Sequence, residues 1–205
     1  MTRHLLLLLF LLTVCCAAPT LAENKPIATP EIGDTAPDWK DLAGTDGKQH
    51  SLSALKGVEV VVVCFTCNSC PYSVDYEDRL IAFQNKFAIG GKVKLIAINS
   101  NGVPADNLDQ MKKRATAKKF SFAYVKDESQ DVARAYGAIY TPEFYVLNRD
   151  RKIIYRGAMD DSTKAENVKV RHVELAVEAA LAGKTPKVTK TGARGCAIRF
   201  KRKRR

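Results

Sequence analysis

The chain has 205 residues, is 46% hydrophobic and carries a formal net charge of +11 at pH 7. This length allows one domain with a full hydrophobic core, which excludes a fold that depends on a disulfide scaffold. Ten of the 33 Lys and Arg residues lie in 184–205, which has no acidic residue, whereas the rest of the chain has 23 basic and 22 acidic residues. We therefore expect a near-neutral domain without specific nucleic-acid binding, and a solvated basic tail over 184–205 that can contact anionic surfaces.

Residues 1–22 have the pattern of a secretory signal peptide. Arg3 and His4 precede the apolar run LLLLLFLLTV, and small residues that suit cleavage follow, up to Ala22. The run is too short to span a bilayer as a helix. An uncleaved anchor, or lipidation at Cys15, are the alternatives. We expect an exported protein, periplasmic or extracellular, whose mature form keeps four of the six cysteines: Cys64, Cys67, Cys70 and Cys196.

The N-terminal part of the mature chain predicts a linker and then a β-hairpin. Three prolines in 23–37 and little apolar periodicity indicate a linker that leads into a domain over 38–183. Short strands at 39–42 and 49–52, joined by a turn at 45–47, would form the hairpin.

The next segment predicts a βαβ unit. VEVVVVCF at 58–65 is almost entirely apolar and β-branched, which is typical of a strand buried on both faces. Apolar residues at helical spacing predict a helix over 71–88, and VKLIAINS at 93–100 predicts a second buried strand. Short connections of this kind give parallel strands and a right-handed crossover.

The C-terminal half adds helices and an antiparallel pair of strands. We expect Asp106 to cap a helix that buries Leu108, Met111 and Ala115, then a strand at 122–125 and a short helix over 130–136. EFYVLN at 143–148 and KIIYRG at 152–157 predict a hairpin. A last helix over 168–182 would bury Val170, Val173, Val177 and Leu181. The elements together predict an α/β fold in which a mixed sheet has helices on both faces.

Three cysteines follow one another at intervals of three residues in VCFTCNSCPY, where the buried strand ends and the helix begins. The unpaired N–H groups of a helix N-terminus stabilise a thiolate. We therefore expect Cys67 to be exposed with a lowered pKa, and Cys70 to be close enough to form a disulfide with it. Cys64 lies within the apolar strand, and we expect it to be an inert core residue.

These features resemble the thioredoxin superfamily, and in particular its peroxiredoxin-like branch of AhpC/TSA and extracytoplasmic thioredoxin-like proteins. The similar stretches run through most of 32–200: GDTAPDWKDLAGTDGKQHSL, FTCNSCPYSVDYEDRL, VKLIAINSNG, AYGAIYTPEFYVLNRDRKIIYRGAMDDS and GCAIRF. The resemblance implies a thioredoxin-like fold, with Cys67 as nucleophile and Cys70 as resolving cysteine. It also implies that Thr141 and Pro142 form the cis-proline loop, which packs beside the disulfide and pairs with the substrate backbone.

The sequence also departs from that family. A typical thioredoxin has an aromatic residue where this chain has Thr66, and a buried acid where it has Val61. Glu59 and Glu143 could replace that acid, although each is expected to be a solvated charge. Peroxiredoxins have a Thr three residues before the peroxidatic cysteine and a Pro further upstream, and neither alignment of the CxxC reproduces both.

The leading interpretation is a thiol–disulfide oxidoreductase that needs no cofactor. Cys67 would attack a protein disulfide and Cys70 would resolve the mixed disulfide, with a separate electron donor or acceptor. One alternative is a thiol peroxidase that uses the same two cysteines. Another is a soft-metal protein that binds copper or zinc through Cys64, Cys67 and Cys70. Cys196 could be an exposed thiol, a partner of Cys64, a distal resolving cysteine or a structural thiol under a docked tail.

Overall fold

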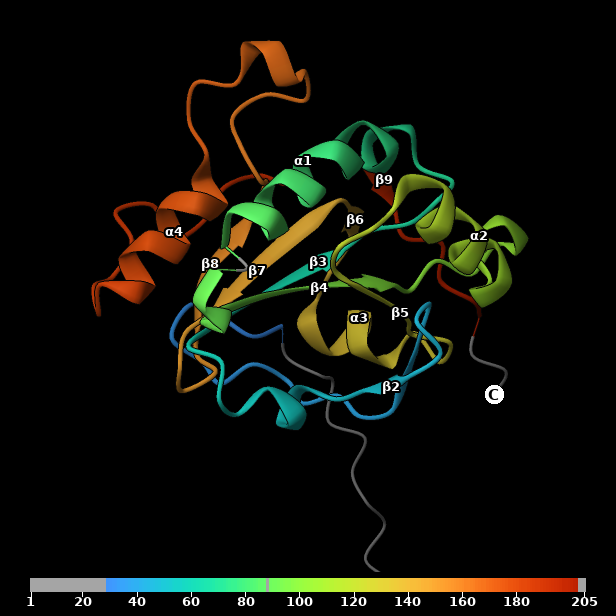
Figure 1. The fold of residues 1–205 in the computed structure, drawn as a ribbon, viewed down its shortest axis with the longest axis horizontal. Coiled ribbons are helices and arrows are strands. Elements are labelled where there is room, and N and C mark those ends of the chain that lie inside the picture. Colours follow the sequence, from blue (N-terminus) through green and yellow to red (C-terminus); the bar gives the residue numbers. More distant parts are fainter. Residues whose placement is uncertain (1–28, 88, 203–205) are drawn as a thin grey trace, which may run out of the picture.

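The computed structural model describes residues 29–87 and 89–202, so the expected signal peptide and the first part of the expected linker lie outside the described residues (Figure 1). A seven-stranded sheet in the order β2-β1-β5-β4-β3-β7-β8 forms the centre. Its strands are β1 (Leu42–Gly44), β2 (Gln49–His50), β3 (Val60–Phe65), β4 (Val93–Asn99), β5 (Ala123–Lys126), β7 (Glu143–Leu147) and β8 (Ile153–Gly157). β3, β4 and β5 are parallel, and the other pairs are antiparallel, so the sheet is mixed as predicted.

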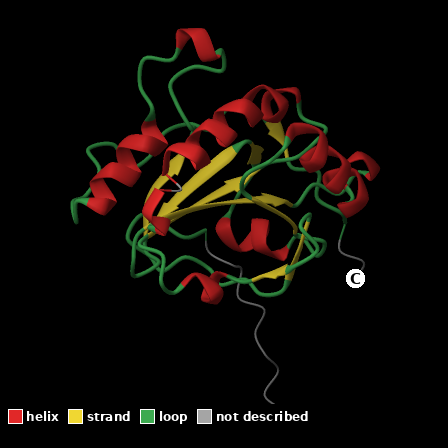
Figure 2. Cartoon of the chain, viewed as in Figure 1, coloured by secondary structure: helices red, strands yellow, loops and turns green. Residues whose placement is uncertain are grey.

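Helices cover both faces of this sheet (Figure 2). The helices are α1 (Pro71–Phe87), α2 (Leu108–Lys118), α3 (Asp131–Tyr136) and α4 (His172–Leu181). Buried side chains of α1, α2 and α4 share one core with Val60 and Val62 of β3, whereas α3 and Trp39 share the other core with Val61 and Val63. All six residues of β3 are buried, because each of its faces packs against a separate core. The structure confirms the expected thioredoxin-like α/β fold.

The N-terminal hairpin is present, but it is shorter than predicted. β1 begins at Leu42 and not at Trp39, because Asp41 has a φ of 53° that interrupts the extended backbone. Trp39 is 3% exposed and lies in the second core from a non-strand position. β1 also pairs with β5, so the hairpin extends the central sheet at one edge.

The second helix begins one residue later than expected. Asn107 is the N-cap of α2 and its side chain accepts a hydrogen bond from the Gln110 N–H at 2.9 Å. The prediction that Asp106 caps this helix is therefore wrong. Met111 is fully buried, whereas Leu108 and Ala115 are partly buried.

The last helix is also shorter than predicted and buries a narrower face. α4 begins at His172, because the Asp161 carboxylate accepts hydrogen bonds from the backbone N–H groups of Lys169 and Val170 and holds them in a loop. Val173 and Val177 are fully buried as expected. The prediction that Val170 and Leu181 face inward is wrong, since they are 37% and 36% exposed.

Both expected peripheral segments pack on the domain where the structure describes them. In 29–37, the Gly33 and Ala36 N–H groups bond to carbonyls of Ile153 and Arg151 at 2.8 Å, so this part is not a free linker. In the basic segment, β9 (Cys196–Ala197) pairs with β6 (Tyr140–Thr141), and Ile198 is 6% exposed. The expectation of a solvated tail is therefore wrong for this part of it. No helix among the described residues is long and apolar enough to cross a membrane.

Candidate active site

Cys67 and Cys70 lie in the loop between β3 and α1, at the carboxyl end of the most buried strand of the sheet. Pro71 is the first residue of α1, where a missing N–H costs least, so the chain turns directly from the motif into the helix. The expectation of an exposed Cys67 is wrong: Cys67 is 3% exposed and Cys70 is 2% exposed. Both cysteines are free in this structure.

Thr141 and Pro142 lie against both sulfurs, and the peptide bond between them is cis. The Thr141 hydroxyl oxygen is 3.4 Å from Cys67 Sγ, and the Thr141 carbonyl oxygen is 3.1 Å from Cys70 Sγ. The structure thus brings together the four residues that sequence reasoning assigned to the site, although the two pairs are far apart in the chain.

The Cys67 and Cys70 side chains shift each other's pKa in opposite directions. A hydrogen bond from Cys67 lowers the pKa of Cys70 to about 4. The same bond, together with burial, raises the pKa of Cys67, so the expected lowered pKa of Cys67 is wrong. Cys70 precedes the first turn of α1 and interacts with the Ser73 N–H and the Cys196 thiol, and these donors outweigh the nearby Thr141 carbonyl. The surroundings of the reduced pair therefore favour a thiolate at Cys70 over one at Cys67.

Asp106 is a fully buried carboxylate that holds the loop between the two cysteines. It accepts hydrogen bonds of 2.6 Å from the Asn68 N–H and from the Ser69 hydroxyl. The side-chain amides of Asn99 and Asn101 add bonds of 3.1 and 2.8 Å. These four donors compensate the burial of the charge. The carboxylate charge also contributes to the raised pKa of Cys67.

Sequence reasoning missed the role of Asp106 because its position suggested a helix cap. The available signal was the polar run Asn99–Asn101, which is buried at the carboxyl end of β4. Tyr124 extends the same network: its hydroxyl accepts a bond from Asn99 and donates one to the Asn68 side chain, both at 2.9 Å. Burial raises the pKa of Tyr124 well above its usual value, so this hydroxyl stays protonated.

The two acids that we expected to be solvated differ from each other. Glu143 is 5% exposed and accepts hydrogen bonds from the backbone N–H groups of Ile139 and Tyr140, at 2.9 and 3.1 Å. It therefore anchors the segment that leads into Thr141, and the expectation of a solvated charge is wrong. Glu59 is partly exposed and pairs with Lys92 at 3.1 Å, away from the two cysteines.

The two remaining cysteines occupy different environments. Cys64 is fully buried in β3, and burial raises the pKa of its thiol well above the usual value. Cys196 is partly exposed in β9, opposite Thr141 in the register, and its backbone carbonyl accepts a hydrogen bond of 3.3 Å from the Thr141 hydroxyl. Cys196 thus lies at the site and apart from Cys64.

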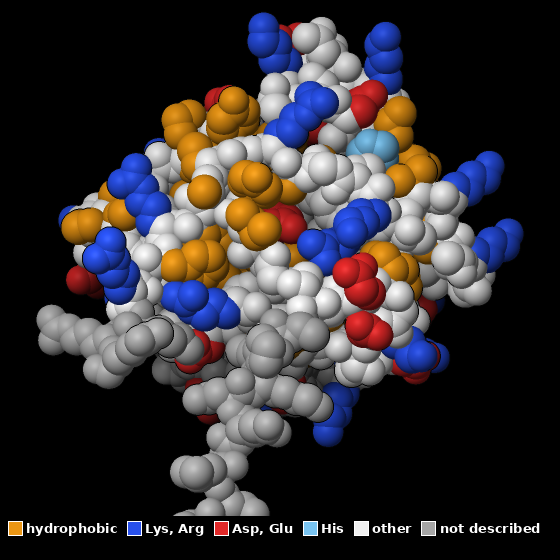
Figure 3. Space-filling model, turned by 180° about the vertical axis from the view of Figure 1, so that it is seen from behind, with side chains coloured by type: hydrophobic (Ala, Val, Ile, Leu, Met, Phe, Trp, Pro, Cys, Tyr) orange, Lys and Arg blue, Asp and Glu red, His pale blue; other side chains and the backbone are white. Residues whose placement is uncertain are grey.

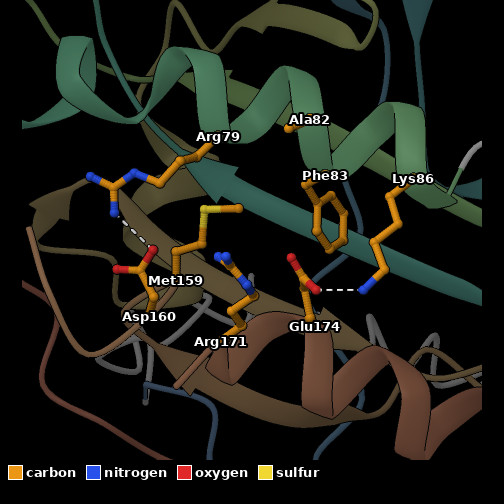
Figure 4. Close-up of a pocket in the computed structure, with 8 residues that line it drawn as sticks. All are labelled: Arg79, Ala82, Phe83, Lys86, Met159, Asp160, Arg171 and Glu174. Carbon is orange, nitrogen blue, oxygen red and sulfur yellow. Dashed lines mark hydrogen bonds and ion pairs between the residues drawn. The ribbon is translucent and has the colours of Figure 1, made fainter. Parts of the chain in front are cut away.

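A metal site and an active site in a pocket between helices are less well supported than a site at the two cysteines. Among residues 29–87 and 89–202, no group of three His, Cys, Asp or Glu side chains could hold a metal ion. A pocket of about 290 Å³ between α1 and α4 contains no cysteine (Figure 4). Its charged side chains include the ion pairs Arg79–Asp160 at 2.8 Å and Lys86–Glu174 at 2.6 Å. The pocket therefore offers no thiol, and Cys67 and Cys70 lie instead at the carboxyl end of β3.

Two solved structures are similar to this chain over most of its length. An uncharacterized conserved protein of Geobacillus kaustophilus has 34% sequence identity and a TM-score of 0.77, over 83% of this chain and 93% of that one. A hypothetical protein of Sinorhizobium meliloti 1021 has 32% identity and a TM-score of 0.78, over 85% and 97% of the two chains.

A third solved structure shares the fold at lower identity. The peroxidoxin BcpB of Mycobacterium tuberculosis has 22% identity and a TM-score of 0.54, over 65% of this chain and 89% of that one. The search of curated proteins finds no match. The model of the AhpC/TSA family matches residues 32–156, which are more than half of the chain. The chain therefore belongs to the AhpC/TSA family, in the peroxiredoxin-like branch of the thioredoxin superfamily.

Proposed function

We propose that this protein is a thiol–disulfide oxidoreductase that exchanges disulfides with protein substrates through Cys67 and Cys70. One observation carries the proposal: both sulfurs of the CxxC motif lie against the cis Thr141–Pro142 bond, with Cys67 Sγ 3.4 Å from the Thr141 hydroxyl oxygen and Cys70 Sγ 3.1 Å from the Thr141 carbonyl oxygen. The lowered pKa of Cys70 supports the proposal, because a dithiol with a depressed pKa can exchange with a disulfide near neutral pH without an added base.

The reaction would proceed in two exchange steps. Cys67 attacks a substrate sulfur while its proton passes to the Cys70 thiolate along their hydrogen bond, and the substrate's second sulfur leaves as a thiolate. Cys70 then passes its proton to the substrate thiolate released in the first step and attacks Cys67 Sγ, which releases the first substrate sulfur as a thiolate and leaves a Cys67–Cys70 disulfide. Two electrons pass from the protein to the substrate. In the opposite direction, the same steps oxidise a substrate dithiol.

Cys67 suits the attacking role because the two loop residues that follow it in the chain are open to solvent. Asn68 is partly exposed and Ser69 is exposed, whereas Cys70 is enclosed by Ser73, Thr141 and Cys196. The Thr141 hydroxyl, at 3.4 Å from Cys67 Sγ, lowers the pKa of Cys67 against the larger opposing effects and can donate to its developing thiolate.

Exposed apolar side chains near the motif support a protein substrate. Tyr72, two residues after Cys70, is 42% exposed, and Ile139 and Tyr140, which precede the cis bond, are 55% and 41% exposed. Exposed apolar surface next to a reactive group favours association with apolar surface on a partner. A separate donor or acceptor must restore the dithiol or the disulfide after each turnover.

A thiol peroxidase is the second candidate, because the AhpC/TSA family model matches this chain. Cys67 would form a sulfenic acid with the peroxide, and Cys70 would condense with it to a disulfide and release water. The position three residues before Cys67 is the buried Cys64, and the same position relative to Cys70 is Cys67 itself, so the expected threonine is missing in both alignments.

We place this activity in an exported compartment, on the basis of residues 1–22. Export would keep the CxxC pair where disulfides form and persist. On the face seen in Figure 3, Lys and Arg side chains are scattered among apolar ones. We also propose that the basic segment 184–205 contacts anionic surfaces through its Lys and Arg side chains.

Insulin reduction and peroxide consumption, measured side by side with dithiothreitol as donor, test the two candidates. We expect insulin reduction by the wild type, a loss of at least about 100-fold in Cys67→Ser and in Cys70→Ser, and little change in Cys64→Ala. The Cys70→Ala variant, expressed with its leader, should trap discrete protein partners on Cys67. Rapid sulfenic acid formation at Cys67, with peroxide turnover above insulin turnover and no trapped partner, would favour the peroxidase instead.

A further inference from the structure

Cys196 is held beside the cysteine pair by the strand β9. In the register of β6 and β9, Cys196 lies opposite Thr141, the residue that contacts both sulfurs of the motif. The Cys196 backbone carbonyl accepts a hydrogen bond of 3.3 Å from the Thr141 hydroxyl, and the Cys70 and Cys196 thiols shift each other's pKa, which places them close together. Three cysteines therefore meet at Thr141, although one of them comes from the far end of the domain.

The position of Cys196 is fixed on both sides. A Cβ at Gly195 would overlap the Thr141 carbonyl, so only glycine allows the strand to approach this closely. After Cys196, the Ile198 N–H bonds to the Ile139 carbonyl at 2.8 Å and the Arg199 N–H bonds to the Asn101 side chain at 2.7 Å. This segment is therefore docked, and the approach of Cys196 to Cys70 is part of the packed fold.

The three thiols differ in their access to solvent. Cys67 and Cys70 are 3% and 2% exposed, whereas Cys196 is partly exposed. A large electron donor that must reach a sulfur atom along the line of a disulfide bond would meet Cys196 more easily than either member of the buried pair.

We propose that Cys196 is a third redox cysteine, which accepts the disulfide from the motif by exchange at Cys70 and presents it to the electron donor. This inference rests on the proposed function, since it assumes that the Cys67–Cys70 disulfide forms during turnover. It gives the docked C-terminal segment a role in the re-reduction of the protein.

The exchange step balances without an added oxidant. The Cys196 thiolate attacks Cys70 Sγ, the Cys67–Cys70 bond breaks, a Cys70–Cys196 bond forms, and Cys67 leaves as a thiolate. An external dithiol then attacks Cys196 Sγ, releases Cys70, and closes its own disulfide by displacing Cys196. Two electrons thus pass from the dithiol to the protein, and the two protons of the dithiol end on protein thiols.

The charges at the site favour exchange from the Cys67–Cys70 disulfide to the Cys70–Cys196 disulfide. In the reduced protein, the interaction with Cys70 is the main reason why the pKa of Cys196 is raised to about 11. Once Cys70 is in a disulfide it carries no charge, so this cause disappears. Arg199 then favours the Cys196 thiolate, since its charge already lowers the pKa of that thiol.

Disulfide mapping tests the pairing. We would oxidise the full-length Cys67→Ala variant with oxidised glutathione, block the remaining thiols and map disulfides by peptide mass spectrometry. We expect a Cys70–Cys196 disulfide, with Cys64 recovered as a blocked thiol. Pairing of Cys70 with Cys64, or only glutathione adducts on Cys70 and Cys196, would overturn the proposal.

The wild type, mapped in a glutathione redox buffer, covers the case in which the variant does not fold. We expect a fraction of the protein to contain a Cys70–Cys196 disulfide. A Cys67–Cys70 disulfide alone would overturn the proposal.

A kinetic test separates the relay from a structural disulfide. Re-reduction of the oxidised protein by a protein dithiol, reduced thioredoxin, followed by acid quench and alkylation, should be at least about tenfold slower in Cys196→Ser than in the wild type. Equal rates would overturn the relay. If the wild type reduces no insulin disulfides, the proposed function fails whatever the mapping shows. If it reduces insulin but never contains a Cys70–Cys196 disulfide, only the relay fails.

Discussion

Ser69, which lies between the two cysteines of the motif, donates a hydrogen bond of 2.6 Å to the buried carboxylate of Asp106. The same carboxylate accepts the Asn68 N–H at 2.6 Å, so both residues between Cys67 and Cys70 are bound to one acid. A loop held in this way presents the two sulfurs at a fixed separation, which favours closure of a small disulfide. Five predictions concern this site and its surroundings.

Replacement of Asp106 by Asn should destabilise the protein and disorganise the motif. The carboxylate accepts four hydrogen bonds, whereas an amide offers one oxygen and points its NH₂ group at other donors. We expect a loss of about 2–4 kcal/mol in the free energy of unfolding, measured by urea denaturation, and slower insulin reduction. Asp109→Asn, at an exposed site in the first turn of α2, is the control and should cost less than about 1 kcal/mol. Similar losses in the two variants would contradict this account.

The reduced pair should titrate far below an ordinary thiol. The pKa of Cys70 is lowered to about 4 from 9.0, mainly by the hydrogen bond from Cys67. Thiolate absorbance at 240 nm should therefore be present at pH 7 and decline with a midpoint near pH 4. Cys67→Ser replaces the thiol donor and should shift this midpoint. An absorbance that first appears above pH 8 would contradict the lowered pKa of Cys70.

The same shift predicts how stability depends on pH. Because the folded pKa lies below the unfolded one, the contribution of Cys70 is complete above pH 9 and is lost as the pH falls towards 4. We expect the reduced protein to lose stability relative to the oxidised protein over this range, since a disulfide has no titrating thiol. Denaturant unfolding of both forms at several pH values measures the difference. A difference that does not change with pH would exclude a buried thiolate.

Thr141→Val should slow the reaction with little change in packing. The substitution keeps the size of the side chain but removes the hydroxyl that lies 3.4 Å from Cys67 Sγ and donates to the Cys196 carbonyl at 3.3 Å. Since that hydroxyl lowers the pKa of Cys67, its loss should raise this pKa further and slow insulin reduction by about tenfold. Thr116→Val, at an exposed site in α2, is the matched control. A Thr141→Val variant as active as this control would assign Thr141 a structural role only.

The exposed apolar side chains near the motif, which include Ile139, should affect the binding of large substrates and not of small ones. Ile139 is 55% exposed beside the cis bond, and Ile139→Ser removes apolar contact area without touching the sulfurs. We expect a several-fold rise in KM for insulin, because about 1 kcal/mol of association free energy is lost, and no change with hydroxyethyl disulfide. Ile89→Ser, at an 85% exposed site beyond the far end of α1, is the control. Equal effects on both substrates would show that Ile139 supports the site and does not bind the partner.

Local patterns were sufficient to predict the elements around the site. The β-branched run of β3, the helical spacing in α1 and the CxxC at their junction depend on residues near one another in sequence, and the structure has them within one or two residues of the predicted bounds. The predicted bounds were wrong where a side chain from outside the element binds its backbone. Before α4, for example, the Asp161 carboxylate accepts hydrogen bonds from two backbone N–H groups and so delays the start of the helix.

Only the tertiary structure decided the environment of the two sulfurs. Burial of Cys67, the charge on Cys70 and the contacts of Asp106, Glu143 and Cys196 all come from segments that are distant in sequence and meet at one end of the sheet. A thiol pKa depends on donors, charges and burial within a few ångströms, and periodicity carries no information about which distant groups fill that space. The sequence by itself determined the strand, the helix and the motif between them, whereas packing of distant segments decided which of the two thiols has the lowered pKa.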